Sequence, residues 1–130
     1  MRTTARETLF KIVFASQFSQ VDEGFKSALY KTDKLDEKDI SYCENILGLI
    51  GEHCGEIAGI IDGHSRLFPE SRLFPADRSL LQIAIAEILY CDDVPEAVSV
   101  NEAANIASKY STDKSASFIS GVLAEIIREK

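Results

Sequence analysis

The sequence predicts an all-α fold, and three observations support this prediction. Apolar residues recur every three or four positions over most of the chain, which is the spacing of one face of an α-helix. No stretch of useful length alternates apolar and polar residues as a half-buried strand does. The chain has 130 residues, 45% of them apolar, with few glycines and prolines, so we expect residues 1–130 to form one domain.

Two helices are expected in the first quarter of the chain. The capping-box pattern Thr4-x-x-Glu7 predicts the start of the first helix, and apolar residues at helical spacing continue it to about Gln20. Residues 21–24 indicate a break, because a glycine and charged residues interrupt the apolar spacing. A short second helix is expected from Phe25.

The longest predicted helix follows, from the acidic residues 36–39 to Ile61. Acids suit the positive end of the helix dipole, and an apolar stripe recurs along the whole stretch. Glycines occupy every fourth position on one side, and each costs about 1 kcal/mol of helix propensity relative to alanine. We expect another helix of the same bundle to approach there, with a second subunit as the alternative. These glycines are Gly51, Gly55, Gly59 and Gly63.

A turn-rich segment at residues 66–76, bounded by Pro69 and Pro75, separates the two halves of the chain. Asp77 then begins a helix that continues to Tyr90. This helix is apolar on nearly every side, as expected for an element at the centre of a bundle.

Two further helices complete the predicted fold. Residues 92–95 indicate a helix stop rather than a calcium loop, because they lack alternating oxygen ligands. The pattern Ser99-x-x-Glu102 predicts a second capping box. The last helix is expected to begin near Asp113 and to carry apolar residues to Ile127.

The charge is unevenly distributed. A net charge of −7 counts against a nucleic-acid ligand if the charge is spread evenly. Residues 1–20 carry three basic side chains and one acidic one, residues 21–99 carry seven basic and sixteen acidic ones, and residues 100–130 carry four of each. The two ends are therefore the candidate positions for an anionic ligand, and the acidic middle suits a basic protein partner.

Several other classes of function are disfavoured. The first residues lack a secretory signal and no window is apolar enough to cross a bilayer, so a cytoplasmic protein is expected. Three cysteines do not make a disulfide framework, and we expect neither a cofactor nor a metal because close Cys or His pairs are lacking. Asp62, His64 and Ser65 are neighbours without an orienting third group, so we expect a surface histidine and no enzyme.

Arg2 and Arg6 are spaced i, i+4 and would share a face at the start of the first helix, beside its unpaired amide donors. Together with the amino terminus they suit phosphate binding. The alternative is that both are ordinary solvated surface arginines.

The order of motifs resembles the NusB family. Five segments carry the resemblance with matching spacing: residues 77–89 (DRSLLQIAIAEIL), 93–95 (DVP), 100–103 (VNEA), 107–110 (ASKY) and 118–123 (FISGVL). The match covers nearly the whole chain, although Gln82, Ala86 and Ser120 depart from the usual residues.

The resemblance implies a compact bundle of about seven helices and a non-enzymatic function. NusB proteins are cytoplasmic transcription antitermination factors that regulate ribosomal RNA synthesis. They bind single-stranded boxA RNA of leader transcripts together with NusE, a small ribosomal subunit protein, within the RNA polymerase antitermination complex. The alternative is a divergent interaction or dimerisation module with weak or no RNA binding. A third reading, the NusB-like domain that precedes a ribosomal RNA methyltransferase, predicts no activity for this chain alone.

The family's RNA contacts lie largely on the arginine-bearing first helix, and the resemblance places them here at Arg2 and Arg6. Thr3 and Thr4 stand where some relatives have further arginines. Fewer phosphate contacts predict weaker RNA binding that depends more on the protein partner. With Arg6 on this surface, Arg6→Glu should weaken RNA binding without unfolding the bundle.

Five further residues are implied to contact RNA. Phe14 and Gln17 match an aromatic-x-x-glutamine pattern of the family, and such an aromatic either stacks on a base or packs in the core. Phe118 heads a matching motif, with Lys109 and Lys114 supplying charge nearby. In addition, Glu87 matches a family glutamate that contacts NusE.

Overall fold

The computed structural model describes residues 2–64 and 73–130, which contain seven α-helices and no strand. The helices are α1 (Arg2–Ser16), α2 (Glu23–Thr32), α3 (Glu37–Glu52), α4 (Cys54–His64), α5 (Pro75–Tyr90), α6 (Glu96–Tyr110) and α7 (Asp113–Arg128). The predicted all-α bundle of about seven helices is therefore confirmed.

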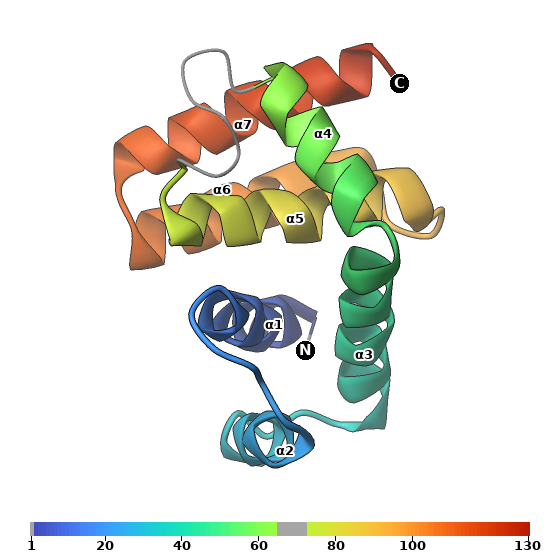
Figure 1. Cartoon of the computed structure of the whole chain (residues 1–130), viewed down its shortest axis with the longest axis vertical. Helices are drawn as coiled ribbons and strands as arrows, with labels where there is room; N and C mark the ends of the chain where they lie inside the picture. The colour runs from blue at the N-terminus through green and yellow to red at the C-terminus, as the bar shows by residue number, and fades with distance from the viewer. Residues whose placement is uncertain (1, 65–72) are drawn as a thin grey trace.

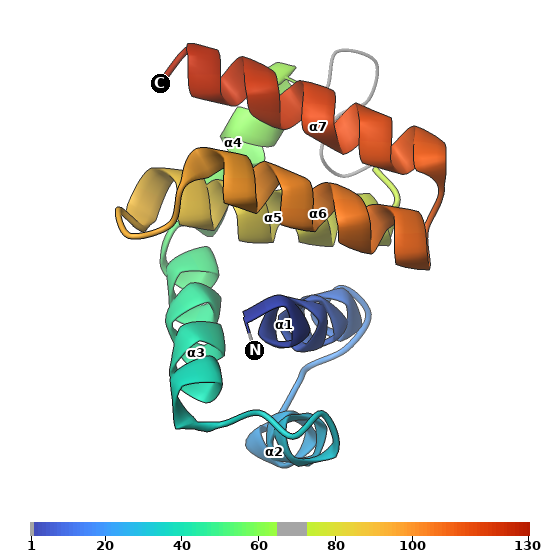
Figure 2. The same ribbon diagram turned by 180° about the vertical axis from the view of Figure 1, so that it is seen from behind.

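The helices are stacked in levels (Figure 1). α2 lies at one end, followed by α1, then α5 with α6, and finally α7, while α3 and α4 run along one side. Figure 2 shows the same order from behind, with α6 nearer the viewer than α5.

α5 is the centre of the bundle, as the sequence predicts. It contacts α1, α3, α4, α6 and α7, and most of its residues are buried. It begins at Pro75 rather than at Asp77, because a proline fits the first position of a helix, where its missing N–H is not needed. Most of the turn-rich segment 66–76, including Pro69, lies outside the described residues.

The first predicted capping box is wrong. α1 already begins at Arg2, so Thr4 lies inside it, and the helix ends at Ser16 rather than near Gln20. The Glu7 carboxylate accepts hydrogen bonds from Lys109 Nζ and Tyr110 Oη of α6, both 2.8 Å long, and so joins α1 to α6.

The second predicted capping box is also wrong. α6 has Pro95 at its N-cap, and Ser99 and Glu102 lie inside the helix. Ser99 Oγ donates to Glu87 (2.9 Å), and the Glu102 carboxylate accepts from Arg6 (3.1 Å). A hydrogen bond to a charged group in the interior stabilises more than a neutral one at the surface, and it determines where these side chains point.

The long helix predicted for residues 36–61 is two helices. Its start is confirmed, because the Asp36 carboxylate accepts from the amide of Asp39 (2.8 Å). However, α3 ends at Glu52, and α4 leaves it at an angle after His53 (Figure 1). The His53 ring stacks on Tyr90 of α5, 3.9 Å between centroids. The apolar stripe continues across the break, so its spacing does not reveal the break.

The glycine side of α3 and α4 packs against no other helix of the described chain. A Cβ atom added at Gly51, Gly55, Gly59 or Gly63 would meet no atom within 4 Å. All four glycines are exposed. The expected approach of a helix from the same bundle is therefore wrong, because α4 turns the opposite side, with Ile57 and Ile61, into the core.

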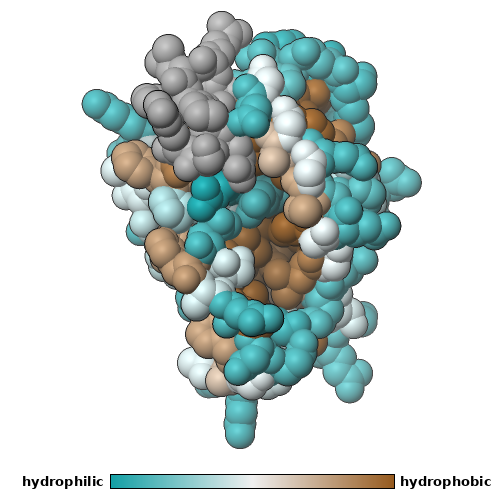
Figure 3. All heavy atoms as spheres, viewed as in Figure 1, coloured by the Kyte–Doolittle hydropathy of each residue, from teal (hydrophilic) through white to brown (hydrophobic). Residues whose placement is uncertain are grey.

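Apolar residues are also visible at the surface. In Figure 3, seen from the side of Figure 1, they gather in a central hollow between the level of α5 and that of α1, framed by hydrophilic residues. Within residues 2–64 and 73–130, none of the helices combines the length and apolarity that crossing a bilayer requires.

Because the glycine side of α4 is open, Gly59→Ala should raise the free energy of unfolding by about 0.5–1 kcal/mol, through helix propensity and a less flexible unfolded chain. Urea denaturation measures this change. Ala58→Gly, at the adjacent position of α4, is the matched control and should lower the free energy of unfolding by a similar amount. Destabilisation by Gly59→Ala would contradict an open glycine face.

Candidate nucleic-acid interface

Arg6 lies in the interior and does not share an exposed face with Arg2. Its side chain is only 4% exposed. Nε and Nη2 donate to the two carboxylate oxygens of Glu87 (3.0 and 2.8 Å), and Nη1 donates to Glu102 (3.1 Å). The expected surface position of Arg6 is therefore wrong, as is the alternative of a solvated arginine, and this guanidinium is not available to phosphate.

Glu87 is equally inaccessible. Its side chain is 1% exposed, and besides Arg6 it accepts hydrogen bonds from the Tyr42 hydroxyl and from Ser99 Oγ. The expected contact of Glu87 with a protein partner would require surface that the residue does not have. The structure instead assigns it to the interior, where it joins α5 to α1, α3 and α6.

The ionisation of this cluster follows from its partners. Burial opposes the charge of Arg6, but the hydrogen bond to Glu87 and the electrostatic interactions with Tyr42, Glu87 and Glu102 together outweigh it and raise the pKa of the guanidinium. Burial, together with the charge of Glu87, raises the pKa of Tyr42. Arg6 is therefore charged and the Tyr42 hydroxyl protonated at neutral pH, so every hydrogen bond of the cluster has a donor and an acceptor.

Arg2 is exposed at the opposite end of α1 from the other candidates. Its guanidinium carbon lies 4.3 Å from the centroid of the Tyr42 ring. It lines an open groove together with Glu37, Lys38 and Asp93, among others. The groove therefore carries both signs of charge, and Arg2 is not part of a purely basic patch.

The other five candidates gather at one end of the bundle: Phe14, Gln17, Lys109, Lys114 and Phe118. The end of α1, the start of α5, the end of α6 and the start of α7 meet there (Figure 1). Gln17 Nε2 donates to Ser79 (3.2 Å) and Gln82 (3.1 Å), and its Oε1 accepts from Arg78 (2.9 Å). These bonds use the polar atoms of Gln17 to attach α1 to α5.

Aromatic rings form a row along this end. The centroid of Phe10 lies 5.3 Å from that of Tyr110 and 5.8 Å from that of Phe14, and Phe14 lies 5.1 Å from Phe18. Phe10 is buried, whereas Phe14 is 36% and Phe18 65% exposed. Phe14 thus packs on one side and faces solvent on the other. Its position is compatible with both expectations from the sequence, packing in the core and stacking on a base.

A groove between the starts of α5 and α7 extends this surface. It is lined by Phe74, Phe118 and Lys114, among others. The buried carboxylate of Asp77 also lines it; burial raises its pKa, and among the described residues its Oδ1 has no hydrogen-bond partner. We call the whole surface the aromatic end, defined by Phe14, Phe18, Phe74, Lys109, Tyr110, Lys114 and Phe118.

Sequence reasoning missed three members of the aromatic end: Phe18, Phe74 and Tyr110. Phe18 and Phe74 lie just outside helices, where an aromatic side chain has no helical face to bury it. An aromatic residue just outside a predicted helix is the sequence signal that could have identified these two residues. Tyr110 ends the matched ASKY segment, directly after Lys109, and this position is the signal that could have identified it.

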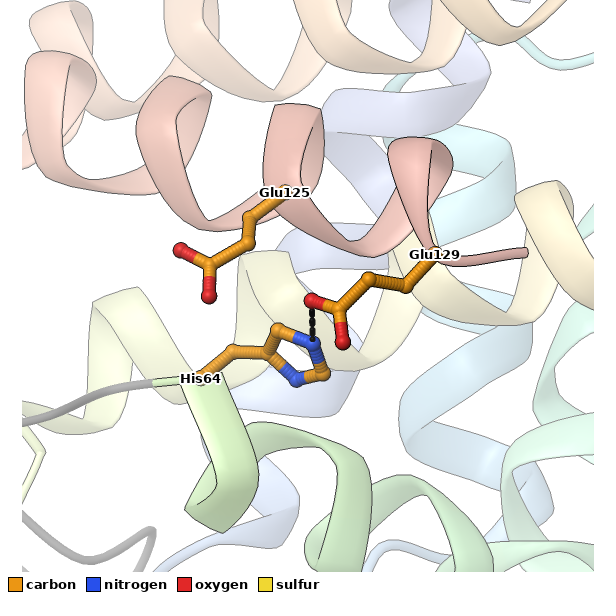
Figure 4. Close-up of side chains that lie close together, drawn as sticks. All are labelled: His64, Glu125 and Glu129. Carbon is orange, nitrogen blue, oxygen red and sulfur yellow. Dashed lines mark hydrogen bonds and ion pairs between the residues drawn. The ribbon is translucent and has the colours of Figure 1, made fainter.

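His64 is partly exposed and paired. Its side chain is 16% exposed, and Nε2 lies 2.8 Å from Oε2 of Glu129, whose side chain is 61% exposed (Figure 4). Its neighbour Ser65 lies outside the described residues. Asp92 and Asp93 are exposed in the turn between α5 and α6.

Comparison with known proteins identifies similar chains. The NusB family model matches residues 1–128. Proteins described as transcription antitermination protein NusB include one from Natranaerobius thermophilus, 36% identical over 98% of this chain and 95% of that protein. Another, from Syntrophomonas wolfei, is 37% identical over 99% and 97%.

Solved structures have the same fold. T. maritima NusB superposes with a TM-score of 0.87 at 26% identity, covering 99% of this chain and 92% of that one. A crystal structure of antitermination factors NusB and NusE in complex with double-stranded RNA gives 0.88 at 21% identity, covering 99% and 97%. The similarity extends over the whole helical bundle.

Because Glu87 is buried, Arg6→Met should lower the free energy of unfolding by about 3–5 kcal/mol, since it leaves a buried carboxylate without its cation. Arg6→Glu should be at least as damaging, contrary to the expectation from sequence. Chemical denaturation measures both. Arg2→Met, which removes an exposed arginine from the same helix, is the control and should change stability by roughly 0.5 kcal/mol or less. Equal effects at the two positions would contradict this account.

Proposed function

The chain belongs to the NusB family, and from this premise we propose that it is a non-enzymatic, cytoplasmic transcription antitermination factor. In this proposal, residues 1–130 act as one RNA-binding domain. The domain binds single-stranded boxA-type RNA of ribosomal RNA leader transcripts together with NusE, and joins the RNA polymerase antitermination complex. It needs neither cofactor nor metal for this role.

The aromatic end is the single observation that carries the proposal. Single-stranded RNA presents unstacked bases, and each base that stacks on an aromatic ring contributes about 1–3 kcal/mol. Phe14 and Phe18 offer exposed rings 5.1 Å apart, and the exposed ring of Tyr110 packs on the buried ring of Phe10, which also contacts Phe14. Phe118 and the exposed Phe74 border the adjoining groove, together with Lys114. This surface supports binding through bases more than through phosphates.

The electrostatic contribution to RNA binding at this surface should be small. Lys114 is exposed, while Lys109 is already paired with Glu7 at 2.8 Å. Arg2 lies about 18 Å along α1 from Phe14, judged from the rise of 1.5 Å per residue. We propose it as a further phosphate contact for a strand that follows this helix. With so few cations, RNA binding should depend on the protein partner.

The side of α3 and α4 suits the protein partner. Glu37, Glu44, Glu52 and Glu56 are exposed on these helices, and such an acidic surface is complementary to a basic ribosomal protein. The hollow of Figure 3 adds apolar surface, and the open glycines have no side chains that would obstruct a close approach. We place the NusE contact on this face, in place of Glu87.

A labelled boxA-type RNA should bind the protein, more tightly with NusE than without it, and binding should weaken as salt is raised. Fluorescence anisotropy at low and moderate salt measures this. Because few phosphates are neutralised, the slope of log K against log salt should be small, about 0.7 for each lysine or arginine engaged. Lack of binding at low salt even with NusE would overturn the proposed function.

Phe18→Ala should weaken RNA binding by roughly fivefold or more, because it removes an exposed stacking ring worth about 1–3 kcal/mol. Phe25→Ala is the matched control: Phe25 is 42% exposed on α2 and is not one of the residues of the aromatic end, so its loss should leave RNA affinity unchanged. Lys114→Ala should lower the salt slope by about 0.7. Equal affinities of the two phenylalanine variants would remove the aromatic end from the interface.

A second function is favoured by the open glycine face alone: a homodimeric interaction module with weak or no RNA binding. In that case the glycines of α4 would meet a second copy. Light scattering at two concentrations distinguishes the two functions. A stable dimer that ignores RNA supports the module, and a monomer removes its structural basis.

A further inference from the structure

The carboxylate of Glu7 lies between α1 and α6 and binds two residues of the aromatic end. Its Oε1 accepts hydrogen bonds from Lys109 Nζ and from Tyr110 Oη, both 2.8 Å long. The proposed function treats Lys109 and Tyr110 as RNA contacts but gives Glu7 no role. Because RNA is a polyanion, an acidic side chain on its binding surface must affect how strongly it binds.

Glu7 also lies on the path of the proposed RNA strand. Phe14 follows it by seven residues in α1, which is about two turns of the helix. The two side chains therefore project within about 20° of each other and about 10 Å apart along the axis. A strand that stacks on Phe14 and follows α1 towards Arg2 passes the pair of Glu7 and Lys109.

Lys109 is placed to bind a phosphate of that strand. Its side chain is 61% exposed, and its Nζ lies 5.4 Å from the centroid of the Tyr110 ring. A nucleotide whose base stacks on the exposed Tyr110 ring would bring its phosphate near this ammonium. The hydrogen bond to Glu7 uses one of the three donors of the ammonium, so geometry does not exclude a phosphate.

The charge of Glu7, however, opposes the phosphate. Hydrogen bonds from Lys109 and Tyr110, together with the charges of Lys109 and Lys11, outweigh burial and hold the pKa of Glu7 below its usual value. Glu7 is therefore ionised at neutral pH, and its pair with Lys109 carries no net charge. Two like charges about 6 Å apart in water repel enough to change an affinity about threefold, and more where solvent is partly excluded.

Glu7 can release Lys109 without being left unsatisfied. Tyr110 Oη still donates to the carboxylate, and Lys11 still contributes positive charge, although its own ammonium is bonded to Asp33 at 3.2 Å. The side chain of Glu7 is 22% exposed, so water can replace the hydrogen bond from Lys109. An exchange of partners by Lys109 therefore leaves no buried acceptor unpaired.

We propose that Glu7 competes with RNA for Lys109. In the free protein the carboxylate neutralises the ammonium, and a phosphate of the bound strand takes its place. Glu7 thus lowers the affinity of the aromatic end for RNA while it holds the Tyr110 ring in position, and it adds to the dependence of binding on the protein partner. This inference rests on the proposed function, because it concerns the same surface.

Glu7→Gln tests the inference in the full chain, by anisotropy of the labelled boxA-type RNA at low and moderate salt. Glutamine keeps an acceptor oxygen for Tyr110 but removes the charge. The variant should bind RNA roughly three- to tenfold more tightly. The slope of log K against log salt should grow by about 0.7, since one more cation is engaged. Circular dichroism checks that the variant is folded.

Glu96→Gln is the matched control. It removes the same charge from a pair of the same length, since Glu96 Oε2 lies 2.8 Å from Lys130 Nζ. Glu96 begins α6, about 20 Å along the helix from Lys109, so its loss should leave the salt slope unchanged. In a Lys109→Met chain, Glu7→Gln should likewise leave the slope unchanged, because the cation for which Glu7 competes is absent.

The outcomes distinguish this inference from the proposed function. If the wild-type chain binds RNA and Glu7→Gln binds it no more tightly, the proposed function stands and the competition is refuted. The competition is also refuted if Glu96→Gln tightens binding as much as Glu7→Gln, because net charge alone would then explain the gain. If neither the wild-type chain nor Glu7→Gln binds at low salt with NusE, both proposals fail.

Discussion

A carboxylate buried in the last turn of α5 constrains the whole bundle. Glu87 is stable there only if its charge and all its acceptor sites are satisfied, because a charge removed from water without a partner costs several kcal/mol. Arg6 supplies the cation from α1, Tyr42 a hydroxyl from α3, and Ser99 a hydroxyl from α6, while Glu102 binds the remaining donor of Arg6. Three helices must therefore dock on α5 in one register, and apolar packing alone would not impose it.

This register determines what α1 presents to solvent. Phe14 follows Arg6 by eight residues, which is about 80° around the helix, so it lies at the edge of the buried stripe rather than within it. Its ring is accordingly half in the core and half exposed, and Phe18 continues the row beyond the end of the helix. An acidic protein with few free cations can thus still offer RNA a recognition surface, since base stacking needs little positive charge. The arginine that would have served phosphate is used to hold the bundle together.

The sequence alone determined the all-helical class, the central position of α5 and the family, because helical periodicity and motif order are local properties that packing did not override. Only the tertiary structure decided the partners of the polar side chains. Ser99 and Glu102 have the spacing of a capping box, yet they bind Glu87 and Arg6, since hydrogen bonds to buried charges outweigh a local cap. The break at His53 and the open glycines of α4 likewise depend on what lies beside the helix. A spacing of three or four residues specifies a face, but what that face meets is determined by chain segments far away in the sequence.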